Sequence, residues 1–446
     1  MILESLTNRK YVPDDRLWEM IKRANSLTEG GYAVWDDNAL TLVPLLKRIL
    51  ARAKEVRDLQ IYFYVMGRTF WYVRRDGVDD IRFAFQISEM FHQAHAEHLA
   101  EETTRFGREF YVDTAARILS FYMKYPQIND EKMKQMLSIF LESDEKYGTV
   151  WNAGSYDKVM RYALFEEDLH LAGRAKKKLE TLDFTNWCYV CYYVRPMLHY
   201  YVFMEEYDRI EELILAVSRK EIAKKYRWCY DQCEQANEET LVEEALEHCM
   251  NLGKDKLFRK IFRKWRDLFT HPMEGEIATC EALLHVFAGD LSRLEETLRV
   301  AEEDDRKGRE MKVTPYDGMY WFLWWHLYFR LLHRQGVDSV KMSLEGWPEA
   351  AEIPENQEIM EKQKTAKVPE KGKPAEEQVM ADVVETLENP ESGGEILTVG
   401  ERSYSCGTLA EYFGGKAREI GARMSRARRN FDYEKVKRSH ERCLGL

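Results

Sequence analysis

The stretch CEALLHVFAGDLSRLEETLRVAEE, residues 280–303, has the pattern of two short helices joined by a turn. The first half is apolar along one side, and Gly289-Asp290 interrupts it, because glycine reaches turn conformations at no steric cost. The second half repeats an apolar residue every three or four positions, as one stripe of a helix does: Leu291, Leu294, Leu298 and Ala301. Neither helix can bury its stripe alone, so we expect the pair to stack on similar pairs.

Similar pairs precede and follow this stretch. From about residue 155 each apolar helix is followed by a turn and then by a more charged amphipathic helix, with turns at Glu167-Asp168, Met204–Glu206, Gly253-Lys254, Gly289-Asp290 and Gly336-Val337. The spacing between these turns is typical of paired-helix solenoids. Residues 1–154 also predict a succession of helices, with a less regular period. The fold class is therefore all-α, an array of helical hairpins.

Residues 155–343 resemble the tetratricopeptide family. The resemblance rests on a small residue, a Gly-Asp turn and the apolar positions after it: Ala282, Gly289, Asp290, Leu291, Leu294, Leu298 and Ala301. It implies a solenoid that binds a protein or peptide partner. The tryptophan and proline positions of the family are mostly missing here.

Composition fits a helical protein without a membrane anchor. The chain of 446 residues is 45% hydrophobic and 13% aromatic, with only 24 glycines and 11 prolines. Its most apolar run, residues 319–329, is too short to cross a bilayer. The N-terminus lacks the pattern of a signal peptide, and the eight cysteines do not have the density of a small disulfide-rich domain. These features predict a cytoplasmic protein.

Charge is distributed unevenly along the chain. The formal net charge is −11, but residues 396–446 hold eleven lysines and arginines against six acidic residues. This end is therefore +5, which leaves −16 for residues 1–395. Between them, residues 344–394 are rich in proline, glutamate and lysine, a composition that predicts a disordered linker. We expect residues 395–446 to form a separate basic module on this linker, beginning with a β-hairpin over 395–405.

The basic module resembles a helix-turn-helix over residues 407–431. Ala410, Gly414 and Ile420 lie at the spacing of the small residue, the turn glycine and the apolar residue of the second helix. The pair Gly414-Gly415 predicts the turn, and Gly421 inside the second helix departs from the pattern. The resemblance implies DNA binding by the cations of this segment: Lys416, Arg418, Arg423, Arg426, Arg428 and Arg429. The alternative is a solvated helix, or one that folds back on the acidic array.

Three other groups of side chains bear on function. Trp321, Trp324, Trp325 and Tyr328 form part of an aromatic helix that either contacts a partner or fills the core between hairpins. Two cysteine pairs, Cys188/Cys191 and Cys229/Cys233, have thiols enough for zinc but lack the glycines of a zinc turn. His92, His95 and His98 spread around a helix instead of converging. We predict no metal and no cofactor.

The sequence thus predicts a non-enzymatic binding protein. Its array binds a protein or peptide, in a regulatory role, and its basic C-terminal module binds DNA. Three alternatives remain open: a scaffold without affinity for nucleic acid, an adaptor whose tail occupies its own acidic groove, and a metal-binding enzyme. No phosphate-loop, dinucleotide, zincin or hydrolase motif occurs in the chain.

Overall fold

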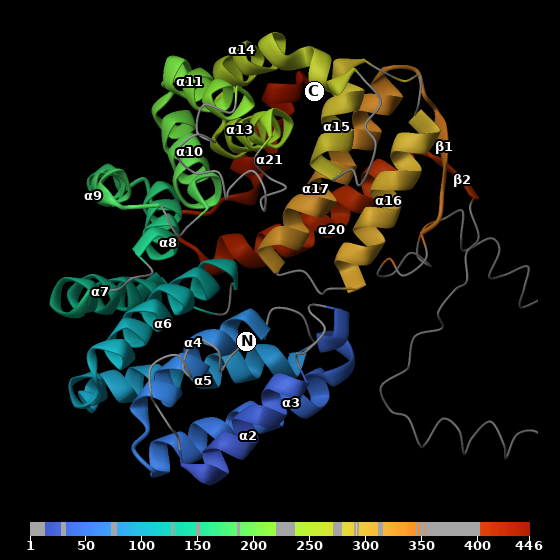
Figure 1. The fold of residues 1–446 in the computed structure, drawn as a ribbon. Coiled ribbons are helices and arrows are strands. Elements are labelled where there is room, and N and C mark those ends of the chain that lie inside the picture. The colour runs from blue at the N-terminus through green and yellow to red at the C-terminus, as the bar shows by residue number, and fades with distance from the viewer. Residues whose placement is uncertain are drawn as a thin grey trace, which may run out of the picture. The chain divides into compact units, whose positions relative to one another are not determined.

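The computed structural model is all-α apart from one two-stranded sheet (Figure 1). It describes residues 14–27, 33–72, 78–125, 128, 130–148, 152–184, 188–219, 237–270, 279–289, 291, 294–310, 315–344, 347, 353 and 402–446. The chain forms two compact units. Unit 1 comprises Met1–His271, Gly308–Trp321 and Ala417–Leu446, and unit 2 comprises Pro272–Lys307 and Phe322–Lys416.

Unit 1 is built from helices that pair with their neighbours in the chain. The first helices are α2 (Asp15–Ser26), α3 (Ala33–Glu55), α4 (Leu59–Tyr72) and α5 (Val78–Ala96), followed by the 3-10 turn η1 (Leu99–Glu102). Next come α6 (Arg105–Lys124), α7 (Asp130–Tyr147), α8 (Asn152–Phe165) and α9 (Leu169–Thr181). The remaining pairs are α10 (Arg195–Met204) with α11 (Tyr207–Ser218), and α13 (Glu238–Leu252) with α14 (Asp255–Trp265), which the 3-10 turn η4 (Arg266–Phe269) extends.

The first helix of each pair also packs on the first helix of the next. Contacts run from α4 to α6, α6 to α8, α8 to α10 and α10 to α13, in addition to those inside the pairs. Figure 1 shows α6, α7, α8 and α9 following one another within unit 1. Their shared core is continuous from Leu17 to Met197. This stacking buries the apolar stripes that no single pair could bury.

The five predicted turns are confirmed by the helix ends. The helices before them end at Phe165, Met204, Leu252, Ala288 and Arg334. Each turn places one residue in the left-handed region, at Glu167, Glu205, Gly253, Gly289 or Gly336. Such a residue reverses the chain after a helix and lets its last carbonyl groups find donors. Before α10 the chain makes one π-helical turn, η2 (Val190–Val194), and Pro196 then lies in the first turn of α10, where its missing N–H is tolerated.

Unit 2 contains the sheet and an aromatic core. Its helices are α15 (Thr279–Ala288), most of α16 (Leu294–Glu310), the larger part of α17 (Pro315–Arg334) and the start of α20 (Cys406–Ala427). Strand β1 (Ser339–Met342) pairs antiparallel with β2 (Arg402–Ser405). The hairpin expected over 395–405 is therefore wrong for its second strand, whose partner comes from residues 339–342, and residues 395–401 lie outside the described residues.

The turn predicted at Gly414-Gly415 is absent, because α20 runs unbroken through both glycines. The reason is a close packing of helices. A Cβ atom on Gly414 would lie 2.6 Å from Nδ1 of His326 on α17, and this nitrogen is 2.7 Å from the carbonyl oxygen of Ala410. Gly421 allows a similar close contact further along α20, because a Cβ atom there would collide with the ring of Tyr433. Both glycines serve helix–helix contact instead of chain reversal.

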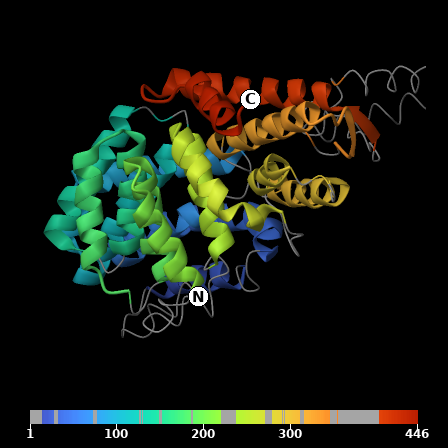
Figure 2. The same ribbon diagram turned by 90° about the horizontal axis from the view of Figure 1, so that it is seen from above.

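The last helix, α21 (Tyr433–Leu444), packs on α13 and α14 within unit 1. The views of Figures 1 and 2 agree in showing the end of the chain alongside the helices of that unit. Asp432 caps α21 by accepting hydrogen bonds from the N–H groups of Glu434 and Lys435. Residues 417–446 thus belong to the same compact unit as the first array of helices. The predicted linker, apart from residues 344, 347 and 353, lies outside the described residues.

Candidate functional site

The aromatic helix predicted as a partner site is α17, and half of the predicted residues are core. Trp325 and Tyr328 are fully buried. The ring of Trp325 stacks on Phe329 and on Phe413, at centroid distances of 5.6 and 5.8 Å. A partner cannot reach these two side chains in this structure. Trp321 and Trp324 are half-buried and keep part of their surface exposed.

Most of the predicted nucleic-acid-binding cations remain at the surface. Arg418, Arg423, Arg426 and Arg429 are exposed, and Lys416 is half-buried. Two of them have acidic neighbours: Arg418 lies 3.9 Å from Glu434, and Arg423 pairs with Glu419 one turn before it. Exposed pairs of this kind are screened by water and leave the arginines open to other partners.

Arg428 is the exception, because it is buried inside unit 1 and 1% of its surface is exposed. Its guanidinium group donates to the carbonyl oxygen of Tyr125 at 2.8 Å and to Oδ1 of Asp130 at 3.3 Å. The next backbone N–H, of Arg429, donates to Oδ2 of Asp130 at 3.1 Å. Arg428 therefore links the end of α20 to Tyr125, after α6, and to Asp130, at the start of α7. The expectation that it contacts DNA is wrong for this structure.

Ionisable side chains recur on α6, α8, α10 and α13, the first helices of four successive pairs. On α6, Arg117 lies 2.7 Å from Asp113, and on α8, Arg161 lies 2.9 Å from Asp157. Between α10 and α13, Arg195 lies 2.6 Å from Glu244. We refer to these residues and the polar groups among them as the polar ladder: Asp113, Arg117, Asp157, Lys158, Arg161, Arg195, His199, Glu244, Glu247 and His248.

Two histidines form the centre of the α10–α13 part of the ladder. The rings of His199 and His248 stack with centroids 3.9 Å apart and planes 13° from parallel. Nε2 of His248 lies 3.5 Å from Glu244. Burial lowers the pKa of His199 well below its ordinary value, and the neighbouring His248 and Arg161 lower it further. Protonation of both stacked rings would be unfavourable, so His199 is neutral at neutral pH.

Other ladder residues are half covered by protein and poorly solvated. Lys158 is half-buried and donates to the carbonyl oxygen of Gly154 at 2.6 Å. Burial lowers its pKa to about 8, helped by the positive charge of Arg117. Burial likewise raises the pKa of Glu247. Burial also opposes ionisation of Glu244, but its hydrogen bond with His248 and the charge of Arg195 outweigh this, so the pKa of Glu244 is lowered.

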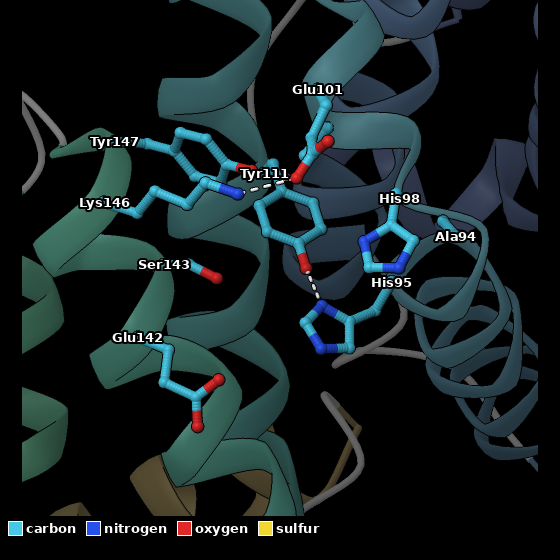
Figure 3. Close-up of a pocket in the computed structure, with 10 residues that line it drawn as sticks. Ala94, His95, His98, Glu101, Tyr111, Glu142, Ser143, Lys146 and Tyr147 are labelled. Carbon is cyan, nitrogen blue, oxygen red and sulfur yellow. Dashed lines mark hydrogen bonds and ion pairs between the residues drawn. The ribbon is translucent and has the colours of Figure 1, made fainter.

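A separate pocket of about 220 Å³ lies where α5 and η1 meet α6 and α7 (Figure 3). Its polar lining comes from three places in the chain. His95 and Glu101 belong to α5 and η1, Tyr111 to α6, and the third group to α7: Glu142, Ser143, Lys146 and Tyr147. His98 also lines it, and its backbone is in the left-handed region with φ 55°, a conformation that non-glycine residues adopt mainly at turns and functional sites.

The pocket is arranged around the contact between His95 and Tyr111. Nδ1 of His95 and the hydroxyl group of Tyr111 share a hydrogen bond, and the Tyr111 ring stacks on Phe91 at 4.9 Å. Burial lowers the pKa of His95 and raises that of Tyr111, so both are neutral at neutral pH. Lys146 pairs with Glu101 at 2.6 Å at the rim. This arrangement offers hydrogen-bonding groups to a small polar moiety.

The structure describes Cys188, Cys191 and the three histidines among the residues considered as metal ligands. Cys188 and Cys191 lie at the start of the π-helical turn, and Cys229 and Cys233 lie outside the described residues. His95 and His98 line the pocket, whereas His92 does not. Over the described ranges, no three histidine, cysteine or carboxylate side chains are grouped as metal ligands. In the same part of the chain, no helix has the length and apolar character to cross a membrane.

The polar ladder was not predicted from the sequence, although a signal for it exists. Asp113/Arg117, Asp157/Arg161 and Glu244/His248 are pairs four residues apart, each on the first helix of a hairpin. Such pairs are common on solvated helix faces. Only their recurrence on the apolar helix of successive pairs distinguishes them.

Comparison with known proteins gives no match: no family model, no curated protein and no solved structure is similar to this chain at a significant level.

Proposed function

We propose that this chain is a cytoplasmic, non-enzymatic binding protein, a tetratricopeptide-like solenoid whose polar ladder binds a segment of a protein or peptide partner. The observation that carries the proposal is the ladder itself. Charged groups recur on α6, α8, α10 and α13, at positions where protein covers them in part. Partly desolvated charges reduce stability unless they are well paired, so an array that needed only a core would bury apolar residues there.

The balance of charge favours a peptide as the ligand. Four cations, Arg117, Lys158, Arg161 and Arg195, are matched by the four carboxylates of the ladder. A polyanion would be repelled by the carboxylates. A peptide presents N–H and C=O groups along its length and side chains of both signs, so it suits a surface with donors and acceptors of both kinds.

The pocket beside Tyr111 supports the same class of function. Its volume of about 220 Å³ suits one side chain or a chain end and is small for a drug-sized metabolite, whose sites measure roughly 300–1,000 Å³. Its neutral His95 and Tyr111 can exchange hydrogen bonds with a polar side chain or a chain end. Of the aromatic residues on α17, Trp321 and Trp324 retain exposed surface, and we propose these two as further contacts for a partner.

The test is selection of peptides from a random display library on the full chain. We expect enriched peptides to bind with micromolar affinity in a fluorescence polarisation assay, and Arg161→Gln to weaken them at least tenfold. The control is Arg174→Gln on α9, an exposed arginine outside the ladder that should leave affinity unchanged. If no peptide is enriched, or if both variants bind equally well, the ladder is not the binding site.

A second candidate function is DNA binding through the exposed cations of the last segment. It is favoured by the surface positions of Arg418, Arg423 and Arg426 on α20. We expect the charge-reversed triple variant Arg418→Glu, Arg423→Glu, Arg426→Glu to weaken binding to duplex DNA in an anisotropy titration. Equal affinity of the variant and the original chain would refute this candidate. It would leave the pure interaction scaffold and the autoinhibited adaptor as alternatives for this segment.

A further inference from the structure

Helix α14 has one apolar side and one cationic side. Leu257, Phe258, Ile261, Phe262 and Trp265 are buried. The remaining positions of Asp255–Trp265 are one acid and five cations: Asp255, Lys256, Arg259, Lys260, Arg263 and Lys264. Since the whole chain has 77 acidic residues against 66 lysines and arginines, this side is opposite in sign to the average surface.

Helix α21 continues this cationic side across a direct contact. Nη2 of Arg259 on α14 donates to the carbonyl oxygen of Arg442 on α21, at 3.3 Å. The two helices pack on each other in unit 1. We define the α14–α21 basic surface as six of the exposed cations of these helices: Lys256, Arg259, Arg263, Lys435, Arg438 and Arg442.

Other cations of α14 are directed to a different neighbour. Nζ of Lys260 lies 3.5 Å from the ring centroid of Tyr207, and Lys264 pairs with Glu211, both on α11. Lys256 and Arg263, by contrast, have no ion-pair partner among the residues that the structure describes, and they lie seven positions apart, on the same side of the helix.

The acidic groups near the surface are too few to neutralise it. Glu167 lies 3.9 Å from Lys435. Asp255 begins α14, and Glu434 lies on α21, 3.9 Å from Arg418. Glu441 is engaged with Lys437, outside the six cations. If Glu167, Asp255 and Glu434 each neutralise one of the six cations, three positive charges remain on the surface.

We propose that the α14–α21 basic surface binds the phosphodiester backbone of duplex nucleic acid without reading its sequence. The proposal deepens the second candidate function and moves its centre from α20 to α14 and α21. Four of the six cations are arginine, whose planar group donates two parallel hydrogen bonds to a phosphate. Lys256 and Arg263 are about 10 Å apart along the helix axis, a distance over which a duplex presents about six phosphate charges.

Two other classes of polyanionic partner fit less well. A helix that lies in a membrane interface inserts apolar side chains beside its cations. In the described part of the chain, the exposed large apolar residues are Leu169 and Met204, and neither belongs to α14 or α21. A single-stranded nucleic acid is held largely by aromatic rings that stack on its bases, and the aromatic residues of the two helices, Phe258, Phe262, Trp265 and Tyr433, are all buried.

The experiment is an anisotropy titration of labelled 20-base-pair duplexes, one of DNA and one of RNA, with the full chain at several salt concentrations. The test variant reverses three charges: Lys256→Glu, Arg263→Glu and Arg438→Glu. We expect affinity to fall at least tenfold, and the slope of log K against log salt to become shallower by about 3 for DNA, because each phosphate contact contributes about 0.9. Binding of either duplex with this response supports the proposal. The duplex that binds with the higher affinity identifies the natural nucleic acid as DNA or RNA.

A charge-matched control separates this response from a general loss of positive charge. Arg16→Glu, Arg48→Glu and Lys177→Glu change exposed cations of α2, α3 and α9 by the same total. We expect this control to bind as the original chain does, and circular dichroism should show all variants folded.

Three results would overturn the proposal. The first is no binding to either duplex at 50 mM salt, which would also refute the second candidate function. The second is undiminished binding by the α14–α21 variant while the α20 variant is weakened, which would leave that function standing on α20 alone. The third is equally tight, equally variant-sensitive binding of polyglutamate or of vesicles with anionic lipid, because the surface would then select charge and not a duplex.

Discussion

Replacing Arg428 by alanine should loosen the last two helices from the array. The change removes the donor to the carbonyl oxygen of Tyr125, at 2.8 Å, and the cation beside Asp130, at 3.3 Å. A buried acceptor left without a donor costs about 1–3 kcal/mol. Removing one partner of a buried ion pair costs about 3–5 kcal/mol when the other stays buried. The side chain of Asp130 is 24% exposed and can regain water, so we expect a loss of about 3 kcal/mol.

The suitable assay is native-state hydrogen exchange, because it reports the free energy of local opening for each helix. We expect the amides of α21 to exchange about 100-fold faster in Arg428→Ala, since 1.4 kcal/mol corresponds to a factor of ten and part of the loss falls on neighbouring segments. The matched control is Arg426→Ala, an exposed arginine two residues earlier that should change the opening free energy by less than about 0.5 kcal/mol. Equal exchange rates in α21 for Arg428→Ala and the original chain would show that Arg428 does not hold the last two helices on the array.

Three further predictions concern packing and pH. Gly421→Ala should destabilise the α20–α21 contact although alanine favours helix by about 1 kcal/mol, because the new Cβ atom would meet the Tyr433 ring; a higher melting temperature would contradict this. Burial lowers the pKa of His440 to about 4, so the unfolded chain binds a proton more readily between about pH 6.5 and pH 4, and stability should fall as pH falls through that window; His440→Phe should flatten this part of a pH series of urea unfolding curves. Burial lowers the pKa of Lys158 to about 8, so stability should rise between about pH 8 and 10, where the unfolded lysine keeps its proton and the folded one has lost it; Lys158→Met should remove that rise, and an unchanged slope would argue against the burial.

The helices and turns of the array could be predicted from the sequence because their signals are local. A stripe such as Leu294, Leu298 and Ala301 records the period of a helix, and the residue that ends a helix in the left-handed region lies at the turn itself. The all-α class follows from these signals.

The contacts of the C-terminal segment could not be predicted, because they depend on partners far away in the chain. Gly414 has the local pattern of a turn, but it lies inside a helix where His326 approaches it, 88 residues earlier in the sequence. The partner of β2 begins at Ser339, and Arg428 pairs with Asp130. A glycine or an arginine looks the same in the sequence whether it makes a turn, binds a phosphate or fastens two helices together.

The ladder illustrates the same limit for the functional site. A pair such as Asp157 and Arg161 is typical of a solvated helix, and only the structure shows that it belongs to a polar network with α10 and α13. The pocket beside Tyr111 also combines residues from α5, α6 and α7 that no single sequence window contains.

The most direct test of the central claim, that the polar ladder binds a peptide segment, is photo-crosslinking of a display-selected peptide to the full chain. A benzophenone group at each position of the peptide in turn, followed by mass spectrometry, identifies the helices in contact. We expect crosslinks to α8, α10 and α13, at residues 152–165, 195–204 and 238–252. Crosslinks confined to α7, α9 and α11, the second helices of the pairs, would contradict it.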